Sequence, residues 1–312
     1  MILCVGGTPA VQRTLRFKSL EPGAVNRAYE VLRVTASGKV VNAARAITVL
    51  GGQALLATFL GGDSGRFVAR ELAARGMPHE VIWTEDDAPT RTCATLIPDD
   101  DHVTELVEEA PPVSERDVAA LEEIVTESLR VARALCLMGS LPPGVPENFY
   151  ARLTVAAREV SVPVLVDAKG ASLYVALAER PFLVKPNLEE AADTLDRPDG
   201  DSDVRVAVAA LTDAGAAWAL VSTGETGSLL GNDSGSLWRV EPPAVEAQNP
   251  IGSGDVMAAG LLLALVRGST VPDAAAYGTA CAAANALTPT AGEVRPDDVE
   301  ALLPWVHLTR LA

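Results

Sequence analysis

The sequence predicts an α/β fold in which helices cover both faces of a central, mostly parallel sheet. From residue 114 onward, short apolar runs typical of buried strands alternate with longer stretches typical of helices. Two segments, at about residues 12–36 and 88–108, are rich in strand-forming residues and do not follow this alternation. They predict a small separate sheet over one edge of the large one.

The individual elements follow from the hydrophobic pattern and its turn residues. Buried strands are expected at residues 2–5, 54–60, 134–138, 163–167, 182–185 and 218–222. Helices are expected at residues 42–50, 64–76, 114–133, 146–160, 171–178, 188–195, 203–214, 255–267 and 272–287. Residues 91–107 predict two strands joined by an acidic turn, and residues 227–240 predict a hairpin.

Composition excludes several classes of function. The 312 residues include 25 basic and 41 acidic side chains, which give a formal net charge of −16. A surface of this charge repels nucleic-acid backbones and anionic membranes, so neither is an expected partner. A small anionic substrate remains compatible if basic residues gather locally around it.

The cysteines and the first residues indicate a cytoplasmic protein. The four cysteines stand in apolar runs without metal-binding spacing, as expected for buried thiols in a reducing compartment. The sequence "MILCVGG" has no basic segment of the kind that begins a signal peptide. The longest apolar runs are also shorter than the roughly 18 residues that a membrane span requires.

The sequence "NPIGSGDVMAAG", residues 249–260, predicts an anion site. Gly252, Ser253 and Gly254 precede a long apolar helix, whose first N–H groups have no partner within the helix. Asp255 follows directly. A carboxylate beside an anion is explained if the anion is a phosphoryl group in transfer and the carboxylate takes the proton of the attacking hydroxyl. The alternative is an aspartate that only stabilises the helix terminus.

Five segments in the same order resemble the ribokinase-like sugar kinases of the phosphofructokinase-B family. "NPIGSGDVMAAGLL" resembles the C-terminal motif of that family, and "SGKVVNAARAITVLGG" at 37–52 is similar to its N-terminal motif. "VKPNLEEA" at 184–191 is similar to its Asn-x-x-Glu element. "MGSLPPGVPENFYA" at 138–151 and "LEPGAVNR" at 20–27 resemble the branch of the 1-phosphofructokinases and tagatose-6-phosphate kinases.

The resemblance implies a ribokinase-like three-layer α/β/α fold, a single kinase domain over residues 1–312, and a small β-sheet lid formed by the segments near 12–36 and 88–108. It also implies an ATP-dependent kinase that acts on a phosphorylated ketohexose such as fructose 1-phosphate. ATP and Mg²⁺ are the implied cofactors, and a homodimer through the lid is the implied assembly.

At the nucleotide end, the resemblance implies that Asp255 is the catalytic base and that the backbone of Gly252, Ser253 and Gly254 forms the anion hole. Asn187 and Glu190 would organise Mg²⁺ through water, since Mg²⁺ usually keeps several waters. The implied nucleotide contacts come from Lys185, Asn187, Ser222, Gly224, Gly227 and Asn285. Without the resemblance, Asn187 is equally a helix N-cap and residues 222–228 an ordinary hairpin turn.

At the sugar end, the matching positions are Gln12, Arg27, Gly38, Lys39, Asn42, Arg91 and Ser140. Lys39 stands at a helix start, where a lysine opposes the helix dipole, and a bound anion would explain it. Arg91 falls where related sugar-phosphate kinases place a phosphate-binding arginine, and Arg27 is a second candidate on the lid. Taken alone, an arginine is usually a surface residue.

The sequence departs from the family pattern mainly at the sugar end. Gln12 stands where the family has an aspartate that binds sugar hydroxyls, and Ser37 and Val40 replace glycines. These changes leave open a kinase for another sugar or a nucleoside. A sugar-binding or regulatory protein without catalysis is a third alternative, against which Asp255, Asn187 and Glu190 argue. A Rossmann dehydrogenase is not expected, because no G-x-G-x-x-G joins the first strand to a helix.

Overall fold

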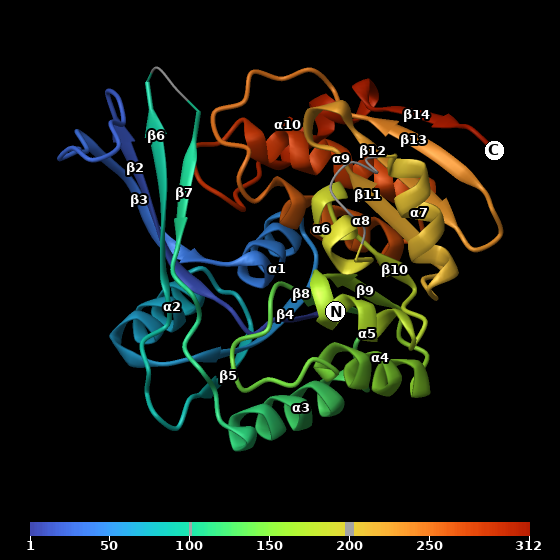
Figure 1. Ribbon diagram of the computed structural model, residues 1–312, viewed down its shortest axis with the longest axis horizontal. Helices are drawn as coiled ribbons and strands as arrows, with labels where there is room; N and C mark the ends of the chain where they lie inside the picture. The colour runs from blue at the N-terminus through green and yellow to red at the C-terminus, as the bar shows by residue number, and fades with distance from the viewer. Residues whose placement is uncertain (100–101, 197–202) are drawn as a thin grey trace.

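A ten-stranded sheet runs through the middle of the computed structural model, which describes residues 1–99, 102–196 and 203–312 (Figure 1). Its strand order is β14-β13-β12-β11-β10-β9-β8-β1-β4-β5, parallel from β11 to β5 and antiparallel from β11 to β14. The strands are β1 (Ile2–Val5), β4 (Ala54–Leu60), β5 (His79–Trp83), β8 (Ala134–Met138), β9 (Val164–Asp167), β10 (Leu183–Val184), β11 (Trp218–Ser222), β12 (Ser228–Asn232), β13 (Leu237–Glu241) and β14 (His307–Arg310). Central strands such as β1 and β8 are entirely apolar and fully buried, as expected for parallel strands covered on both faces.

Helices cover both faces of this sheet. Apolar side chains from α1, α2, α8, α9 and α10 form one core, and those from α3 to α7 form the other. The helices are α1 (Lys39–Val49), α2 (Gly62–Ala74), α3 (Glu115–Leu129), α4 (Phe149–Glu159), α5 (Gly170–Leu177), α6 (Leu188–Thr194), α7 (Val204–Asp213), α8 (Ser253–Val266), α9 (Val271–Ala286) and α10 (Pro296–Leu302). The predicted three-layer α/β/α arrangement is confirmed.

A four-stranded sheet stands apart from the large one, as the sequence predicts (Figure 1). Its order is β3-β2-β6-β7, built from β2 (Ala10–Phe17), β3 (Glu30–Ser37), β6 (Thr92–Pro98) and β7 (Thr104–Val107). Its strands come from the two segments that interrupt the α/β alternation. The acidic turn expected between β6 and β7 includes residues 100–101, which lie outside the described residues.

Helices α8 and α9 pack closely because small residues face each other between them. A Cβ atom at Gly260 would lie 2.6 Å from the Cys281 sulfur, and one at Gly278 would lie 2.6 Å from the Met257 carbonyl oxygen. Helix α8 is apolar around its circumference because the sheet lies on one side of it and α9 on the other. This packing fixes the start of α8, where the predicted anion site lies.

The structure differs from the sequence-based prediction at several boundaries. The strand expected at 182–185 is only Leu183–Val184, and the helices expected at 114–133 and 146–160 are shorter at both ends. Strands β5 and β14 and helix α10 are not predicted. Within the described ranges, no helix combines the length and the apolar character needed to cross a bilayer.

Candidate active site

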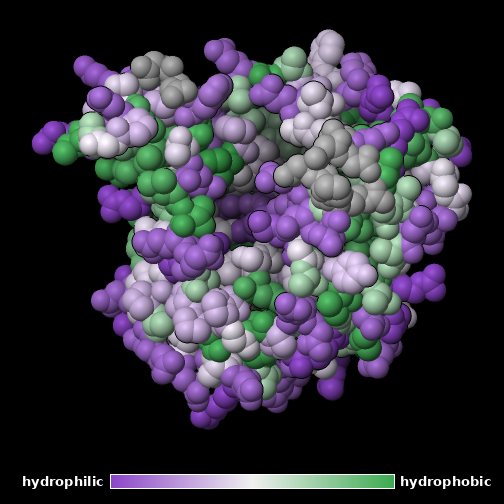
Figure 2. Space-filling model, in the orientation of Figure 1, coloured by the Kyte–Doolittle hydropathy of each residue, from purple (hydrophilic) through white to green (hydrophobic). Residues whose placement is uncertain are grey.

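A pocket of about 1060 Å³ lies at the carboxyl ends of the parallel strands β9, β10 and β11. Parallel α/β sheets bind ligands at this edge. On the face shown in Figure 2, the molecule is hollowed between the small sheet and the C-terminal half, and hydrophilic residues surround the hollow. Eleven of the sequence-predicted site residues line the pocket: Lys39, Lys185, Asn187, Glu190, Ser222, Gly224, Gly227, Gly252, Ser253, Gly254 and Asp255.

The N-terminus of α8 forms one wall of the pocket. Gly252 caps the helix with φ 83°, and a Cβ atom there would lie 2.6 Å from the Gly292 nitrogen. Only glycine meets both conditions without strain. Ser253 and Gly254 open the helix beside it. The Ser253 N–H donates to the Pro250 carbonyl oxygen at 3.2 Å, whereas the N–H groups of Gly252 and Gly254 have no protein acceptor among the described residues and are available to an anion in the pocket.

Asp255 lies in the first turn of α8 and is only 7% exposed. Its Oδ2 accepts a hydrogen bond of 2.8 Å from the Asn42 Nδ2 of α1. Burial raises the pKa of Asp255 to about 6, although the positive charge of Lys39 opposes the shift. A carboxylate of this kind is more basic than an ordinary aspartate and is still largely ionised at neutral pH. These are the properties required of a general base.

Lys39 joins acidic residues from two other elements. Its Nζ lies 3.1 Å from Asp167 Oδ1 at the end of β9 and 2.9 Å from Glu190 Oε1 on α6. Lys185 Nζ lies 2.8 Å from Asp167 Oδ2. Burial opposes the ionisation of Asp167, but Lys185 and Lys39 hold its pKa below the usual value. The floor of the pocket is therefore a network of opposite charges, in which Asp167 and Lys185 are buried and Lys39 and Glu190 are partly exposed.

Asn187 and Glu190 form a capping box at the start of α6. The Asn187 side chain accepts a hydrogen bond from the Glu190 nitrogen (2.7 Å), and Glu190 Oε2 accepts one from the Asn187 nitrogen (3.0 Å). The helix N-cap reading of Asn187 is thus confirmed, and it does not exclude a second role because both residues line the pocket.

These oxygen donors fit Mg²⁺ bound through water. Within the residues described, no three His, Cys, Asp or Glu side chains form a group that could hold a metal ion directly. Asp167 and Glu190 nevertheless present carboxylates to the pocket, and their charge is only partly neutralised by the two lysines. Hard carboxylate oxygens that leave room for water and phosphate are a typical Mg²⁺ environment.

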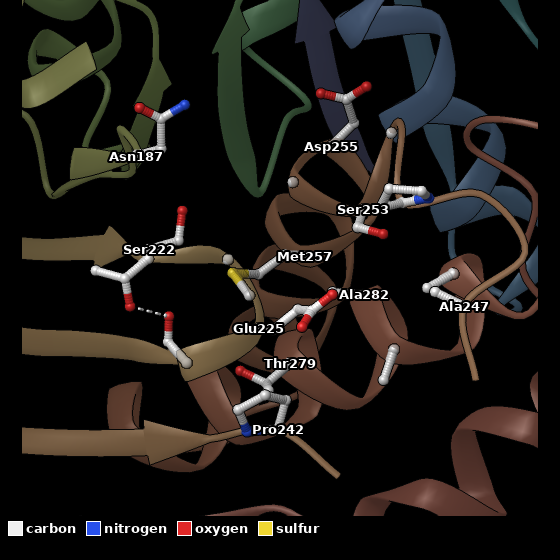
Figure 3. A pocket seen from close by; sticks show the side chains of 18 of the residues that line it. Asn187, Ser222, Glu225, Pro242, Ala247, Ser253, Asp255, Met257, Thr279 and Ala282 are labelled. Carbon is white, nitrogen blue, oxygen red and sulfur yellow. Dashed lines mark hydrogen bonds between the residues drawn. The ribbon is translucent and has the colours of Figure 1, made fainter. Parts of the chain in front are cut away.

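The opposite end of the pocket is lined by small and apolar residues (Figure 3). The turn after β11 supplies Ser222, Gly224 and Gly227, and Pro242 follows β13. Helix α9 contributes Thr279 and several alanines, and α8 contributes Met257. A cavity end of small, mostly uncharged residues beside a set of charged groups suits a ligand with a planar ring at one end and phosphates at the other.

Asn285, whose position implies a nucleotide contact, is not among the residues that line the pocket. Its side chain is fully buried and bonds to Ile251, Ser253 and Gly292. Its neighbours Ala282, Ala283 and Ala286 on α9 line the pocket. Asn285 therefore lies beneath the wall formed by the start of α8.

The predicted sugar-end residues are only partly brought together. Gly38 and Lys39 begin α1, and Gly139, beside Ser140, has Thr8 and Lys39 as its nearest neighbours. Arg91 Nη2 donates to the Thr8 carbonyl at 3.0 Å, so it reaches the same loop. Ser140 and Arg91 nevertheless do not line the large pocket. Arg91 lines a separate small cavity.

Gln12 and Arg27 lie elsewhere. Gln12 is buried on β2 and donates through Nε2 to Thr95 Oγ1 at 2.7 Å. Arg27 is exposed in the loop between β2 and β3, which Figure 1 shows at the outer end of the small sheet. Arg27, the second candidate for binding the sugar phosphate, is not among the residues that line the large pocket.

Asp167 is a site residue that the sequence analysis missed. It is 1% exposed and binds both pocket lysines. The available signal was its position as the last residue of the apolar strand "PVLVD", where a parallel strand delivers its side chain to the ligand-binding edge.

Comparison with known proteins identifies the family. The model of the pfkB family carbohydrate kinases matches residues 1–298. The chain belongs to this family. It is therefore a carbohydrate kinase, a phosphotransferase whose acceptor is an alcohol group.

Solved structures agree with this assignment. Phosphofructokinase-2 from Escherichia coli, in complex with potassium, is 26% identical to the kinase over 98% of this chain and 99% of that one, with a TM-score of 0.86. A possible 1-phosphofructokinase from Thermotoga maritima has the same fold, with a TM-score of 0.88 and 20% identity over the whole of both chains. A carbohydrate kinase from Agrobacterium tumefaciens aligns with a TM-score of 0.76 and 24% identity over 99% of each chain.

Proposed function

We propose that the kinase transfers the γ-phosphoryl group of ATP to a hydroxyl of a phosphorylated ketohexose such as fructose 1-phosphate. The observation that carries the proposal is the buried Asp255 in the first turn of α8, beside the glycine-rich start of the helix. Two similarities support the substrate class. Escherichia coli phosphofructokinase-2 has been crystallised with fructose 6-phosphate, and the Thermotoga protein is named as a possible 1-phosphofructokinase.

In the proposed reaction, Asp255 accepts the proton of the sugar hydroxyl as that oxygen attacks the γ-phosphorus. The bond from phosphorus to the bridging oxygen of ATP breaks, and ADP leaves. The N–H groups of Gly252 and Gly254 donate hydrogen bonds to the phosphoryl oxygens during transfer, and that of Ser253 joins them if it leaves the Pro250 carbonyl. Asn42 holds the carboxylate in place through its 2.8 Å hydrogen bond.

ATP would occupy the 1060 Å³ pocket, with its base against the small residues of α9 and the turn at Ser222, Gly224 and Gly227. Lys185 would neutralise phosphate charge. Asn187 and Glu190, with Asp167 nearby, would hold Mg²⁺ through water. When bound, Mg²⁺ would supply positive charge to the phosphate oxygens.

The sugar would bind beside Lys39, between the turn at Gly38 before α1 and the turn at Gly139 after β8, within reach of Asp255. Asn42 orients the base rather than a free hydroxyl, because its amide already donates to Asp255. Arg91 and Ser140, on the far side of the Thr8 loop, are the proposed contacts for the sugar phosphate. Gln12 would take part only if its hydrogen bond to Thr95 opened.

The test is an ATP-consumption assay with purified kinase across fructose 1-phosphate, fructose 6-phosphate, tagatose 6-phosphate, the matching neutral sugars and nucleosides. We expect kcat/KM to be highest for one of the ketohexose phosphates. Turnover confined to neutral sugars or nucleosides would contradict the substrate class and the role of Arg91. Arg91→Gln should raise the KM for the sugar phosphate and leave the KM for ATP unchanged.

We also propose that the kinase is a cytoplasmic homodimer joined through its small sheet. The four cysteines are buried and unpaired, which suits a reducing compartment. The small sheet has exposed apolar residues, among them Val34 and Leu106. One related structure is a tetrameric inhibited form of Escherichia coli phosphofructokinase-2.

A further inference from the structure

The side chain of Asn285 is oriented by two backbone groups that each have only one hydrogen-bonding role. The Gly292 N–H can only donate, and it lies 2.8 Å from Asn285 Oδ1. The Ile251 carbonyl can only accept, and it lies 3.1 Å from Asn285 Nδ2. The oxygen and nitrogen of the amide therefore cannot be exchanged without losing both hydrogen bonds in the fully buried core.

This fixed amide determines the role of the Ser253 hydroxyl. Asn285 Nδ2 also lies 3.0 Å from Ser253 Oγ and can only donate to it. The serine oxygen is thus the acceptor, and its own hydrogen remains available for another partner. Among the described residues, the structure shows no protein acceptor that takes this hydrogen.

The hydroxyl stands close to positively charged or polarised groups of the anion site. Ser253 is the first residue of α8, it lines the pocket, and it projects from the same helical turn as Asp255 (Figure 3). The Lys185 ammonium group lies 3.5 Å from the position that a Cβ atom on Gly254 would take. A donor here, among N–H groups and an ammonium group, faces negative charge when the nucleotide is bound.

We infer that the Ser253 hydroxyl is a catalytic hydrogen-bond donor to the phosphoryl group in transfer, and that Asn285 is the positioning residue that aims it. The backbone N–H groups of the anion hole do not depend on the side chain at residue 253, so this donor is additional to them. The inference rests on the phosphoryl transfer proposed above, but not on the identity of the sugar.

The first test is the steady-state kinetics of Ser253→Ala, with whichever acceptor the wild-type kinase phosphorylates. We expect kcat to fall about tenfold, while the KM values for ATP and for the acceptor stay within about twofold, as for a donor used mainly in the transition state. Ser253→Thr keeps the hydroxyl and should retain most of the kcat. Ser269→Ala, just beyond the C-terminal end of the same helix, is the matched control and should behave as wild type.

An unchanged kcat in Ser253→Ala would overturn the inference, as would a raised KM for ATP with an unchanged kcat. If the wild-type kinase does not phosphorylate the predicted sugar, only the proposed substrate is wrong. The inference about Ser253 is still tested, because the assay uses the acceptor that the kinase does phosphorylate.

The second test separates positioning from a purely structural role of Asn285. Asn285→Ala is made in the wild-type and in the Ser253→Ala background, and kcat is compared in a double-mutant cycle. If Asn285 acts by aiming the hydroxyl, Asn285→Ala should lower kcat by a large factor in the wild-type background. In the Ser253→Ala background, where no hydroxyl remains to be aimed, that factor should be smaller by about threefold or more. Equal factors in both backgrounds would show that Asn285 only supports the loop.

Discussion

Asp255 combines two properties that normally oppose each other. It lies buried in a site that excludes water, and it must be ionised to accept a proton. Burial raises its pKa to about 6, and Asn42 and Lys39 limit the rise. The sequence predicts Asp255 from its place after the glycine turn. It cannot predict the Asn42 contact, which joins residues 213 positions apart and depends on how α1 packs beside α8.

The pH dependence of stability tests this environment. The carboxyl pKa of an unfolded aspartate is about 3.9 and that of folded Asp255 is about 6, so the folded state is penalised once the pH rises through this window. Asp255→Asn should therefore be more stable than wild type by about 2–3 kcal/mol at pH 8, from the two-unit shift at about 1.4 kcal/mol per unit. The gain should shrink as the pH falls from 6 to 4.

Urea unfolding of both proteins at pH 8 and pH 4.5 measures the difference in the free energy of unfolding. A difference that is the same at both pH values would contradict the raised pKa.

Two predicted site residues are hydrogen-bonded to other groups of the protein. Asn285 matches a nucleotide-binding position by sequence, but it lies on the inner side of α9 and holds the loop at Gly292. Gln12 is drawn to Thr95 across the small sheet. Asp167 went unnoticed because one aspartate after an apolar strand has no motif around it. For Gln12 and Asp167, the deciding partners Thr95 and Lys39 are distant in the chain.

At the scale of the element, the start of α8 depends on the conformation of Gly252. Its φ of 83° costs a residue with a side chain about 1–2 kcal/mol, and a Cβ atom would also approach the Gly292 nitrogen to 2.6 Å. Gly235 offers a matched control, because its φ is 84° and nothing lies within 4 Å of its Cβ position.

Gly252→Ala should lose about 3 kcal/mol or more of unfolding free energy and most of its kcat, since the loop at Gly292 must move. Gly235→Ala should lose only about 1–2 kcal/mol and keep its kcat. Thermal or urea unfolding with a kinase assay compares the two. Equal losses of stability would mean that the close contact at Gly292 contributes nothing.

Element boundaries follow the sequence where a cap or an unbroken apolar run marks them. Ser114 with Asp117 and Asn187 with Glu190 form capping boxes. Helices α3 and α6 begin directly after the N-cap residues Ser114 and Asn187. Strands β5 and β14 were missed because they lie at the edges of the large sheet and are partly exposed, so their apolar pattern is weak. Sheet edges carry less hydrophobic signal than sheet centres.

At the scale of the whole molecule, the alternation of strands and helices was enough to predict the layered fold and the separate small sheet. The packing that brings Lys39, Asp167 and Glu190 together was not predictable, because each comes from a different element. The small sheet also has an exposed face, and the family resemblance implies a homodimer through this sheet. The register places Val34, Arg13, Ala94 and Leu106 in one row on that face, so one exposed arginine interrupts the apolar residues.

This face is the proposed dimer contact. Val34 is 38% exposed and Leu106 is 56% exposed, and Figure 2 shows hydrophobic residues gathered over the small sheet. Leu106→Lys should weaken the dimer at least about tenfold, because a charge would be buried in an apolar contact. Val131→Lys, an exposed valine just after α3, is the control. Sedimentation velocity over a concentration series measures both, and a monomeric wild type would contradict the proposal.

The central claim is that Asp255 is the base of a phosphoryl transfer at the start of α8. The most direct measurement compares kcat and ATP binding for wild type, Asp255→Asn and Asp273→Asn, an exposed aspartate in the first turn of α9. We expect Asp255→Asn to lose about 100-fold or more of its kcat, while its Kd for ATP and the kcat of Asp273→Asn stay close to wild type. A kcat for Asp255→Asn within about threefold of wild type would contradict the claim, since a removed general base costs far more.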